Sequence, residues 1–118
     1  MAALKAAGLP QVPVTGQDAE TEALQRILVG DQYMTVYKAL RAEAEAAATL
    51  TDQLLRGQHP SGTSTVANGT GQVPSILLDP VAVTKDTIAA TVVKDGFVTP
   101  GALCAGAYAD ACRAAGIG

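Results

Sequence analysis

The feature that most constrains the fold is a change of hydrophobic period that occurs twice in the first half of the chain. Residues 11–15 hold a short β-branched run, and an apolar stripe at helical spacing follows from Ala19 until Gly30. Tyr33-Met34-Thr35-Val36-Tyr37 is a second strand-like run, and a longer helical stripe extends from Ala39 to Arg56. Two consecutive strand–helix units are typical of a parallel, right-handed arrangement. The sequence therefore predicts an α/β protein with parallel strands and flanking helices.

Size and charge restrict the classes of protein that the chain can belong to. With 118 residues it has room for one domain, and its formal net charge of −3 and eight scattered Lys and Arg residues argue against a nucleic-acid partner. No apolar run approaches the roughly 20 residues that span a bilayer, and the N-terminal residues lack the apolar middle of a secretory signal. We expect no direct membrane insertion in this chain and no export signal within it.

The rest of the chain is expected to be a polar connection followed by an edge strand and short helices. Residues 57–71 are rich in Gly, Ser, Thr and Asn, and Asn68-Gly69 is a strong turn signal. Further expected elements are a helix end in residues 1–7, a crossing or edge strand at Ile76–Val83, a short helix at Thr84–Val93, an N-cap at Thr99 before Pro100, and a helix at Ala105–Ala115 that stops at Gly116.

Two charged residues follow the first two predicted strands. In open α/β sheets ligands bind beyond the carboxyl ends of the strands, and Asp18 and Lys38 both fall there. Asp18 offers acceptor oxygens to neighbouring hydroxyls and Lys38 offers up to three donors, a combination that suits a small polyhydroxylated ligand. Two other interpretations are open, because Asp18 would also serve as an N-cap and Lys38 as a solvated surface residue. Gly16 is interpreted as room for the chain to turn, and Gln17 as a turn residue.

The remaining reactive side chains give no metal or catalytic signature. His59 is the only histidine and lies in the polar loop, so we predict a surface residue, no metal site and no cofactor. Cys104 and Cys112 are eight residues apart, which on an unbroken helix separates their Cα atoms by on the order of 12 Å. A disulfide therefore needs a bend, which Gly101 and Gly106 are able to supply, and two free thiols are the alternative.

Three segments together resemble one family. VPVTGQDAE, QRILVGDQYMTVYK and VPSILLDPVAVTKDTIAATVVKDGF look like the C-terminal part of the sugar-binding proteins of ABC importers, closest to the D-xylose group. This resemblance implies a partial type I periplasmic-binding-protein fold, two α/β lobes that close on a monosaccharide by a hinge motion. It implies that Asp18 and Lys38 contact the sugar and that this sugar is D-xylose or a similar pentose. It also implies that a membrane permease is the partner of the full-length protein.

The resemblance also assigns parts of the chain to the two lobes. Residues 1–37 would belong to the C-terminal lobe, residues 38–75 would pack on the N-terminal lobe, and residues 76–118 would supply a return strand and the C-terminal helices. It implies that most of the N-terminal lobe, the stacking aromatics and the export signal lie upstream, so we expect an N-terminally truncated fragment that is weak or inactive alone. A periplasmic or extracytoplasmic location, as a cell-surface lipoprotein, is implied in the same way.

Two other classes of function are compatible with the residues. A small α/β enzyme would use a desolvated Lys38 to form a Schiff base with a carbonyl substrate. The effector domain of a sugar-responsive repressor shares the fold, although no helix-turn-helix precedes the domain here and the charge is acidic. The binding-protein interpretation, with no catalysis, accounts best for the three motifs.

Overall fold

The computed structural model describes residues Met1–Gly118, which divide into two compact units. The first unit combines Met1–Lys38 with Val81–Gly118, and the second is Ala39–Pro80. Every buried hydrophobic residue belongs to the first unit, so the hydrophobic core lies there. None of the helices combines the length and the hydrophobicity that crossing a membrane requires.

A three-stranded mixed sheet forms the centre of the first unit. Its order is β1 (Thr15–Gln17), β2 (Met34–Tyr37) and β5 (Val81–Val83). β1 and β2 run parallel, as predicted, and β5 pairs with β2 in the antiparallel sense as an edge strand. The predicted strand at residues 11–15 is displaced toward the C-terminus, because Pro13 has no N–H to donate to a ladder. Of the apolar segment Ile76–Val83, only β5 is paired with another strand.

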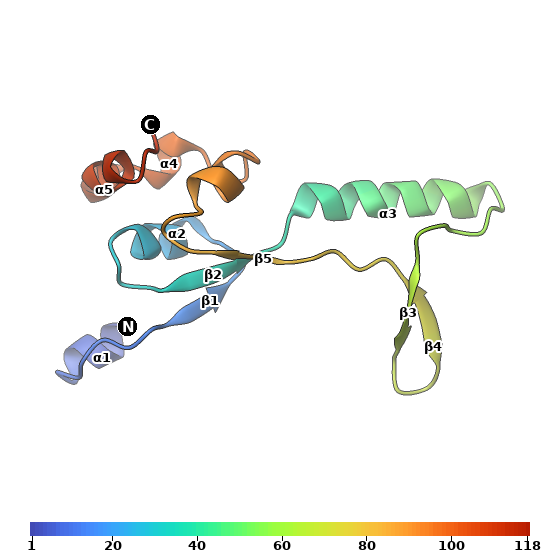
Figure 1. The fold of residues 1–118 in the computed structure, drawn as a ribbon, viewed down its shortest axis with the longest axis horizontal. Helices are drawn as coiled ribbons and strands as arrows, with labels where there is room; N and C mark the ends of the chain where they lie inside the picture. The colour runs from blue at the N-terminus through green and yellow to red at the C-terminus, as the bar shows by residue number, and fades with distance from the viewer. The chain divides into compact units, whose positions relative to one another are not determined.

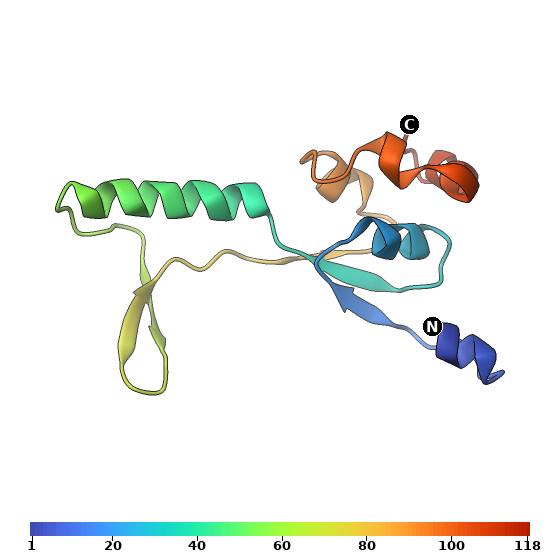
Figure 2. The same cartoon turned by 180° about the vertical axis from the view of Figure 1, so that it is seen from behind.

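Helix α2 (Thr21–Leu28) covers one face of this sheet, between the strands and the C-terminal helices (Figures 1 and 2). Its buried stripe consists of the residues predicted from the helical period, Ala23, Leu24, Ile27 and Leu28. The helix ends before Gly30, whose φ of +81° is a conformation that glycine adopts without strain. The strand–helix–strand order was thus predicted correctly for this part of the chain. A short helix, α1 (Ala2–Ala6), precedes it.

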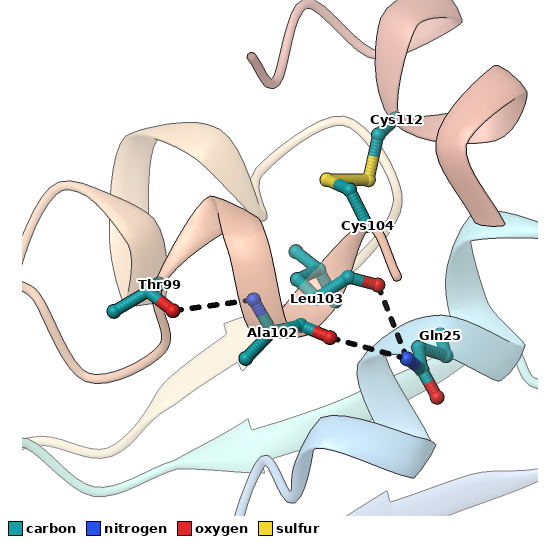
Figure 3. The surroundings of a disulfide bond; sticks show 6 residues. All are labelled: Gln25, Thr99, Ala102, Leu103, Cys104 and Cys112. Carbon is teal, nitrogen blue, oxygen red and sulfur yellow. Dashed lines mark hydrogen bonds between the residues drawn. A yellow bond between two sulfur atoms is a disulfide. The ribbon is translucent and has the colours of Figure 1, made fainter. Parts of the chain in front are cut away.

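The C-terminal region consists of short helical segments joined by a disulfide. A π-helical segment, η1 (Ala89–Val93), precedes α4 (Pro100–Leu103), η2 (Gly106–Tyr108) and α5 (Ala109–Ala114). The predicted cap is present, since the Thr99 hydroxyl accepts a hydrogen bond from the Ala102 N–H at 3.2 Å. A continuous helix from Ala105 was wrong, because Ala105 is extended and Gly106 has a φ of +59°. This bend brings the Cα atoms of Cys104 and Cys112 to 5.7 Å, and the two cysteines form a disulfide (Figure 3).

The second unit contains a helix and a β-hairpin. Helix α3 spans Leu40–Leu55, close to the predicted bounds, and none of its residues is buried. The polar segment after it, residues 57–71, was interpreted as a plain connection, but it contains β3 (Ser64–Ala67), which pairs antiparallel with β4 (Gln72–Ser75) directly after the segment. The predicted turn at Asn68 joins these two strands, and the Asn68 Oδ1 accepts hydrogen bonds from the backbone N–H groups of Thr70 and Gly71, both at 3.0 Å. The sequence signal therefore located the turn but missed the strands.

Candidate functional site

The parallel pairing of β1 and β2 places the two predicted site residues side by side. Asp18 follows the last residue of β1 and Lys38 follows the last residue of β2. The Lys38 Nζ lies 2.6 Å from the Asp18 Oδ1, so the two side chains form an ion pair at the carboxyl edge of the sheet. The expected proximity of these side chains is confirmed, whereas their role toward a ligand stays a prediction.

The backbone at Asp18 does not have the conformation that a helix cap would require. The N-cap of α2 is Glu20, two residues later, and no side chain caps this helix. Asp18 and Ala19 instead have φ angles of 78° and 51°, in the left-handed region that residues other than glycine seldom occupy. The interpretation of Asp18 as the N-cap of this helix was therefore wrong. Its carboxylate bonds Lys38 rather than the backbone of the helix.

Gly16 also has a different role from the one that its sequence suggests. It is the central residue of β1, and the turn begins after Gln17. A Cβ atom at position 16 would lie 2.5 Å from the Nε2 of Gln32, a separation that requires one of the two to move. Gln32 is 6% exposed, accepts a hydrogen bond from the Nε of Arg26 at 3.1 Å and donates one to the Met34 carbonyl at 3.0 Å. Glycine at position 16 gives this buried amide the space it occupies.

Thr35 lies directly beneath the turn that carries Asp18. It is fully buried in β2, and its hydroxyl accepts a hydrogen bond from the Ala19 N–H at 3.2 Å. The Asp18 N–H donates to the Val36 carbonyl at 2.8 Å. The sequence analysis considered Thr35 only as a strand former. A polar residue at an inward-facing strand position was the signal available, because a buried hydroxyl needs a hydrogen-bonding partner.

The ion pair lies at the surface and keeps part of its contact with water. The side chains of Lys38 and Asp18 are 47% and 57% exposed. The hydrogen bond from Lys38 lowers the pKa of the Asp18 carboxyl, and the side chain of Gln17, at the end of β1, acts in the same direction. An exposed pair of this kind contributes little to folding stability. Its groups are therefore accessible to a ligand that competes for the same hydrogen bonds.

A cavity of about 540 Å³ lies elsewhere in the first unit. Its walls come from the segment before β1, the loop between α2 and β2, and the turn after β5. These segments meet at the end of the sheet opposite to the carboxyl ends of β1 and β2. The Asp18–Lys38 pair is not part of this cavity.

The other reactive side chains do not form a second site of this kind. The structure contains no group of three or more His, Cys, Asp or Glu side chains that could hold a metal ion. His59 lies exposed between α3 and β3, and both cysteines are used in the disulfide. No buried side-chain nitrogen or oxygen lacks a hydrogen-bonding partner.

Comparison with known proteins gives matches to one kind of protein. Over 96 residues the chain is 46% identical to the D-xylose-binding periplasmic protein of Escherichia coli (strain K12), covering 80% of this chain and 29% of that protein. It is 44% identical over 98 residues to the D-xylose-binding periplasmic protein of Haemophilus influenzae, covering 82% and 30%. No protein-family model matches the chain.

A solved structure agrees with these sequence matches. It is the crystal structure of an ABC transporter solute binding protein from Clostridium phytofermentans with bound β-D-glucose, 30% identical, with a TM-score of 0.77. The match covers 86% of this chain and 32% of that one. This chain is homologous to part of the sugar-binding proteins of ABC transporters.

The homology confirms the family resemblance and the fold class predicted from the sequence. The structure is a mixed α/β fragment with a parallel strand pair, and it matches part of a sugar-binding protein. The chain spans 29% and 30% of the length of the two curated relatives. Those relatives are periplasmic binding proteins rather than enzymes, in agreement with the expected absence of catalysis. The assignment of residues 1–37, 38–75 and 76–118 to two lobes stays a prediction.

Proposed function

We propose that this chain is part of the sugar-binding component of an ABC importer, and that Asp18 and Lys38 contact the sugar. D-xylose or a similar pentose is the proposed ligand, and a membrane permease is the proposed partner of the full-length protein. One observation carries this proposal: an acceptor and a donor, 2.6 Å apart, extend from the carboxyl edge of two adjacent parallel strands in a homologue of sugar-binding proteins.

The chemistry of the pair suits a molecule with neighbouring hydroxyl groups. The Asp18 carboxylate accepts hydrogen bonds from two hydroxyls, and the Lys38 ammonium donates to a hydroxyl or ring oxygen. Hydrogen bonds to ionised groups are stronger than those between neutral groups, so a sugar gains from contact with both residues. Since the two charged groups are neighbours, a sugar hydroxyl that displaces their mutual contact meets a donor and an acceptor at once.

The exposure of the site indicates that the chain alone binds a sugar weakly. Each hydroxyl that leaves water must find a partner in the protein, and tight sites enclose most of their ligand. About half of each charged side chain is in contact with solvent here. We expect dissociation constants in the millimolar range, which corresponds to about 4 kcal/mol of binding free energy or less.

The disulfide supports an extracytoplasmic location for the proposed receptor. Disulfides persist in secreted and periplasmic proteins and are rare in the reducing cytosol. Cys104 and Cys112 are bonded in this structure, and the relatives from E. coli and H. influenzae are periplasmic. A lipid anchor on the full-length protein is part of the same proposal.

The environment of Lys38 disfavours the alternative of a Schiff-base enzyme. A lysine nucleophile is activated by desolvation or by a nearby cation. Lys38 is about half-exposed, so it is not desolvated, and the group that it bonds is an anion rather than a cation. We therefore expect no covalent adduct when the chain is treated with D-xylose and borohydride, as judged by intact-protein mass spectrometry.

The binding proposal is tested by titrating D-xylose into the ¹⁵N-labelled chain and following its amide signals by NMR. We expect the signals of Asp18, Lys38 and their neighbours to shift with a saturable, millimolar dependence on sugar. The substitutions Asp18→Asn and Lys38→Met should abolish these shifts, because each removes one of the two charged partners.

A second ion pair in the same unit provides a matched control. Lys5 and Asp31 are bonded at 2.9 Å, so Asp31→Asn removes one carboxylate charge away from the proposed site. This variant should bind D-xylose as the original chain does, and D-glucose serves as the comparison ligand. Signals of Asp18 and Lys38 that do not respond to either sugar, up to the highest concentrations used, would contradict the proposal.

A further inference from the structure

Two successive residues in the turn after β1 adopt a conformation that their side chains disfavour. Asp18 and Ala19 have positive φ angles, and neither residue is glycine. Such backbone conformations persist only where surrounding contacts determine them, and they concentrate at functional sites. The turn therefore requires contacts that hold it in this form.

Two hydrogen bonds to β2 supply these contacts. The Asp18 N–H donates to the Val36 carbonyl, which continues the ladder between β1 and β2 by one residue. The Ala19 N–H donates to a side chain rather than to the backbone, and its acceptor is the Thr35 hydroxyl oxygen at 3.2 Å. Both Ala19 and Thr35 are fully buried, so water cannot replace this second hydrogen bond.

We infer that Thr35 is a positioning residue, whose buried hydroxyl holds the left-handed turn that directs the Asp18 carboxylate toward Lys38. Thr35 does not itself contact Lys38 in the hydrogen bonds of the turn, and it acts through the backbone of Ala19. The importance of this role for sugar binding rests on the proposed function of Asp18.

The hydroxyl group, rather than the shape of the residue, is what the turn needs. Valine has nearly the same shape as threonine but no acceptor, so Thr35→Val would leave the buried Ala19 N–H without a partner. The turn would then relax toward ordinary φ angles and the carboxylate would move away from Lys38. Serine retains the acceptor, so Thr35→Ser should keep the turn and the ion pair.

The test compares Thr35→Val and Thr35→Ser with the original chain of 118 residues, without ligand, by NMR. Scalar couplings of residues 18 and 19 report whether their φ angles are positive, and the ¹³C signal of the Asp18 carboxyl reports its pKa. In Thr35→Val we expect loss of the positive-φ couplings and a rise of this pKa toward its ordinary value. In Thr35→Ser we expect both measurements to match those of the original chain.

These readouts separate a positioning role from a contribution to stability alone. If Thr35→Val lowers the unfolding midpoint but leaves the couplings and the Asp18 pKa unchanged, the inference is overturned. If Thr35→Val does not fold, the hydrogen-exchange rate of the Ala19 N–H in the original chain tests the inference instead. The Ala19 N–H must then exchange as slowly as the buried ladder amides, and exchange at the rate of an exposed amide would contradict the inference.

Sugar binding is measured separately, so that the two proposals fail independently. Titration of Thr35→Val with D-xylose should show no saturable shift at Lys38, whereas Thr35→Ser should respond as the original chain does. A chain that binds no D-xylose in any form overturns the proposed function, while the ligand-free couplings still decide the role of Thr35.

Discussion

At the scale of single residues, the candidate site depends on backbone geometry as much as on charge. Asp18 reaches Lys38 from a left-handed turn, and that turn is bonded to Thr35 in the neighbouring strand. Gly16 has no side chain at the point where the Gln32 amide packs against β1. The Asp18 carboxylate therefore depends for its position on two uncharged residues, Thr35 and Gly16.

The lowered pKa of Asp18 predicts how the stability of the chain depends on pH. The folded-state pKa lies below the unfolded value, so the pair contributes its full stabilisation at pH values above the ordinary aspartate range, about 4. This contribution falls as the pH decreases through the folded-state pKa. Urea unfolding between about pH 6 and pH 2.5 should show the original chain more stable than Asp18→Asn at pH 6 and equal to it in acid.

Lys38→Met is the matched variant for this experiment. Removing Lys38 removes the main cause of the lowered pKa of Asp18. The Lys38→Met variant should therefore lack the acid-dependent loss of unfolding free energy that this pair causes in the original chain. A difference between the original chain and Asp18→Asn that persists at the acid limit would show that Asp18 stabilises the fold by something other than this pair.

The proximity of Asp18 and Lys38 could be predicted from sequence because each follows a strand-like run, and the ends of parallel strands share an edge. The contacts that support them could not be predicted in the same way. The bond from Ala19 to Thr35 and the packing of Gly16 against Gln32 join residues on different elements. Their existence depends on strand register, which a local pattern does not specify.

At the scale of elements, α2 connects the sheet to the C-terminal helices. The side chain of Gln25 donates hydrogen bonds to the carbonyls of Leu103, at 3.1 Å, and Ala102, at 3.5 Å, at the end of α4 (Figure 3). Cys104, the next residue after Leu103, forms the disulfide with Cys112, which is buried in α5. The last helix is therefore attached to the core through a short covalent loop.

Removal of this disulfide should destabilise the C-terminal region. A loop with a sequence separation of 8 residues corresponds to about 2–3 kcal/mol of lost unfolded-state entropy. We expect the double variant Cys104→Ser, Cys112→Ser to lose about that much free energy of unfolding in urea. Hydrogen exchange should show reduced protection in residues 104–117 first. An unchanged unfolding midpoint would mean that the loop adds nothing to the stability of the core.

The elements that periodicity predicted are those with a strong local pattern. The four buried residues of α2 recur at helical spacing, and Thr99-Pro100 is a helix start in both sequence and structure. The hairpin of β3 and β4 was missed because its strands are short, exposed and rich in small polar residues. Its stability depends on cross-strand pairing, and the composition alone indicates a loop.

At the scale of the whole molecule, the core and the candidate site belong to one unit. No residue of Ala39–Pro80 is buried, whereas the other unit contains all of the buried hydrophobic residues. The second unit leaves and re-enters the first at neighbouring points, because Tyr37 and Val81 are register partners in the antiparallel pair of β2 and β5. The strands on either side of the second unit are therefore paired directly with each other in the sheet.

This register predicts that the first unit folds without the second. Replacing residues 39–80 by Asn-Gly-Thr would join β2 and β5 through a two-residue hairpin turn, with threonine in place of Pro80 because proline has no N–H for the hydrogen bond that closes the turn. The shorter connection lowers the entropy of loop closure, by at most about 3 kcal/mol, and removes no buried side chain. We expect a single cooperative urea transition, with the near-ultraviolet dichroism of Tyr37 and Phe97 retained, because their rings pack with centroids 5.0 Å apart.

A non-cooperative transition, or loss of the aromatic signal, would contradict this prediction. The sequence alone did not reveal that the two units differ in burial, since α3 has an apolar stripe of its own. A helical stripe indicates which face of a helix is apolar, but it does not identify the surface that covers that face.

The left-handed turn has a consequence for how such a gene changes over generations. Glycine at position 18 would relieve the left-handed backbone without disturbing the core, because Asp18 is exposed. A lineage in which the carboxylate had become dispensable would therefore tend to exchange it for glycine. The residue at position 18 in proteins descended from this one would therefore indicate whether selection for the carboxylate continues.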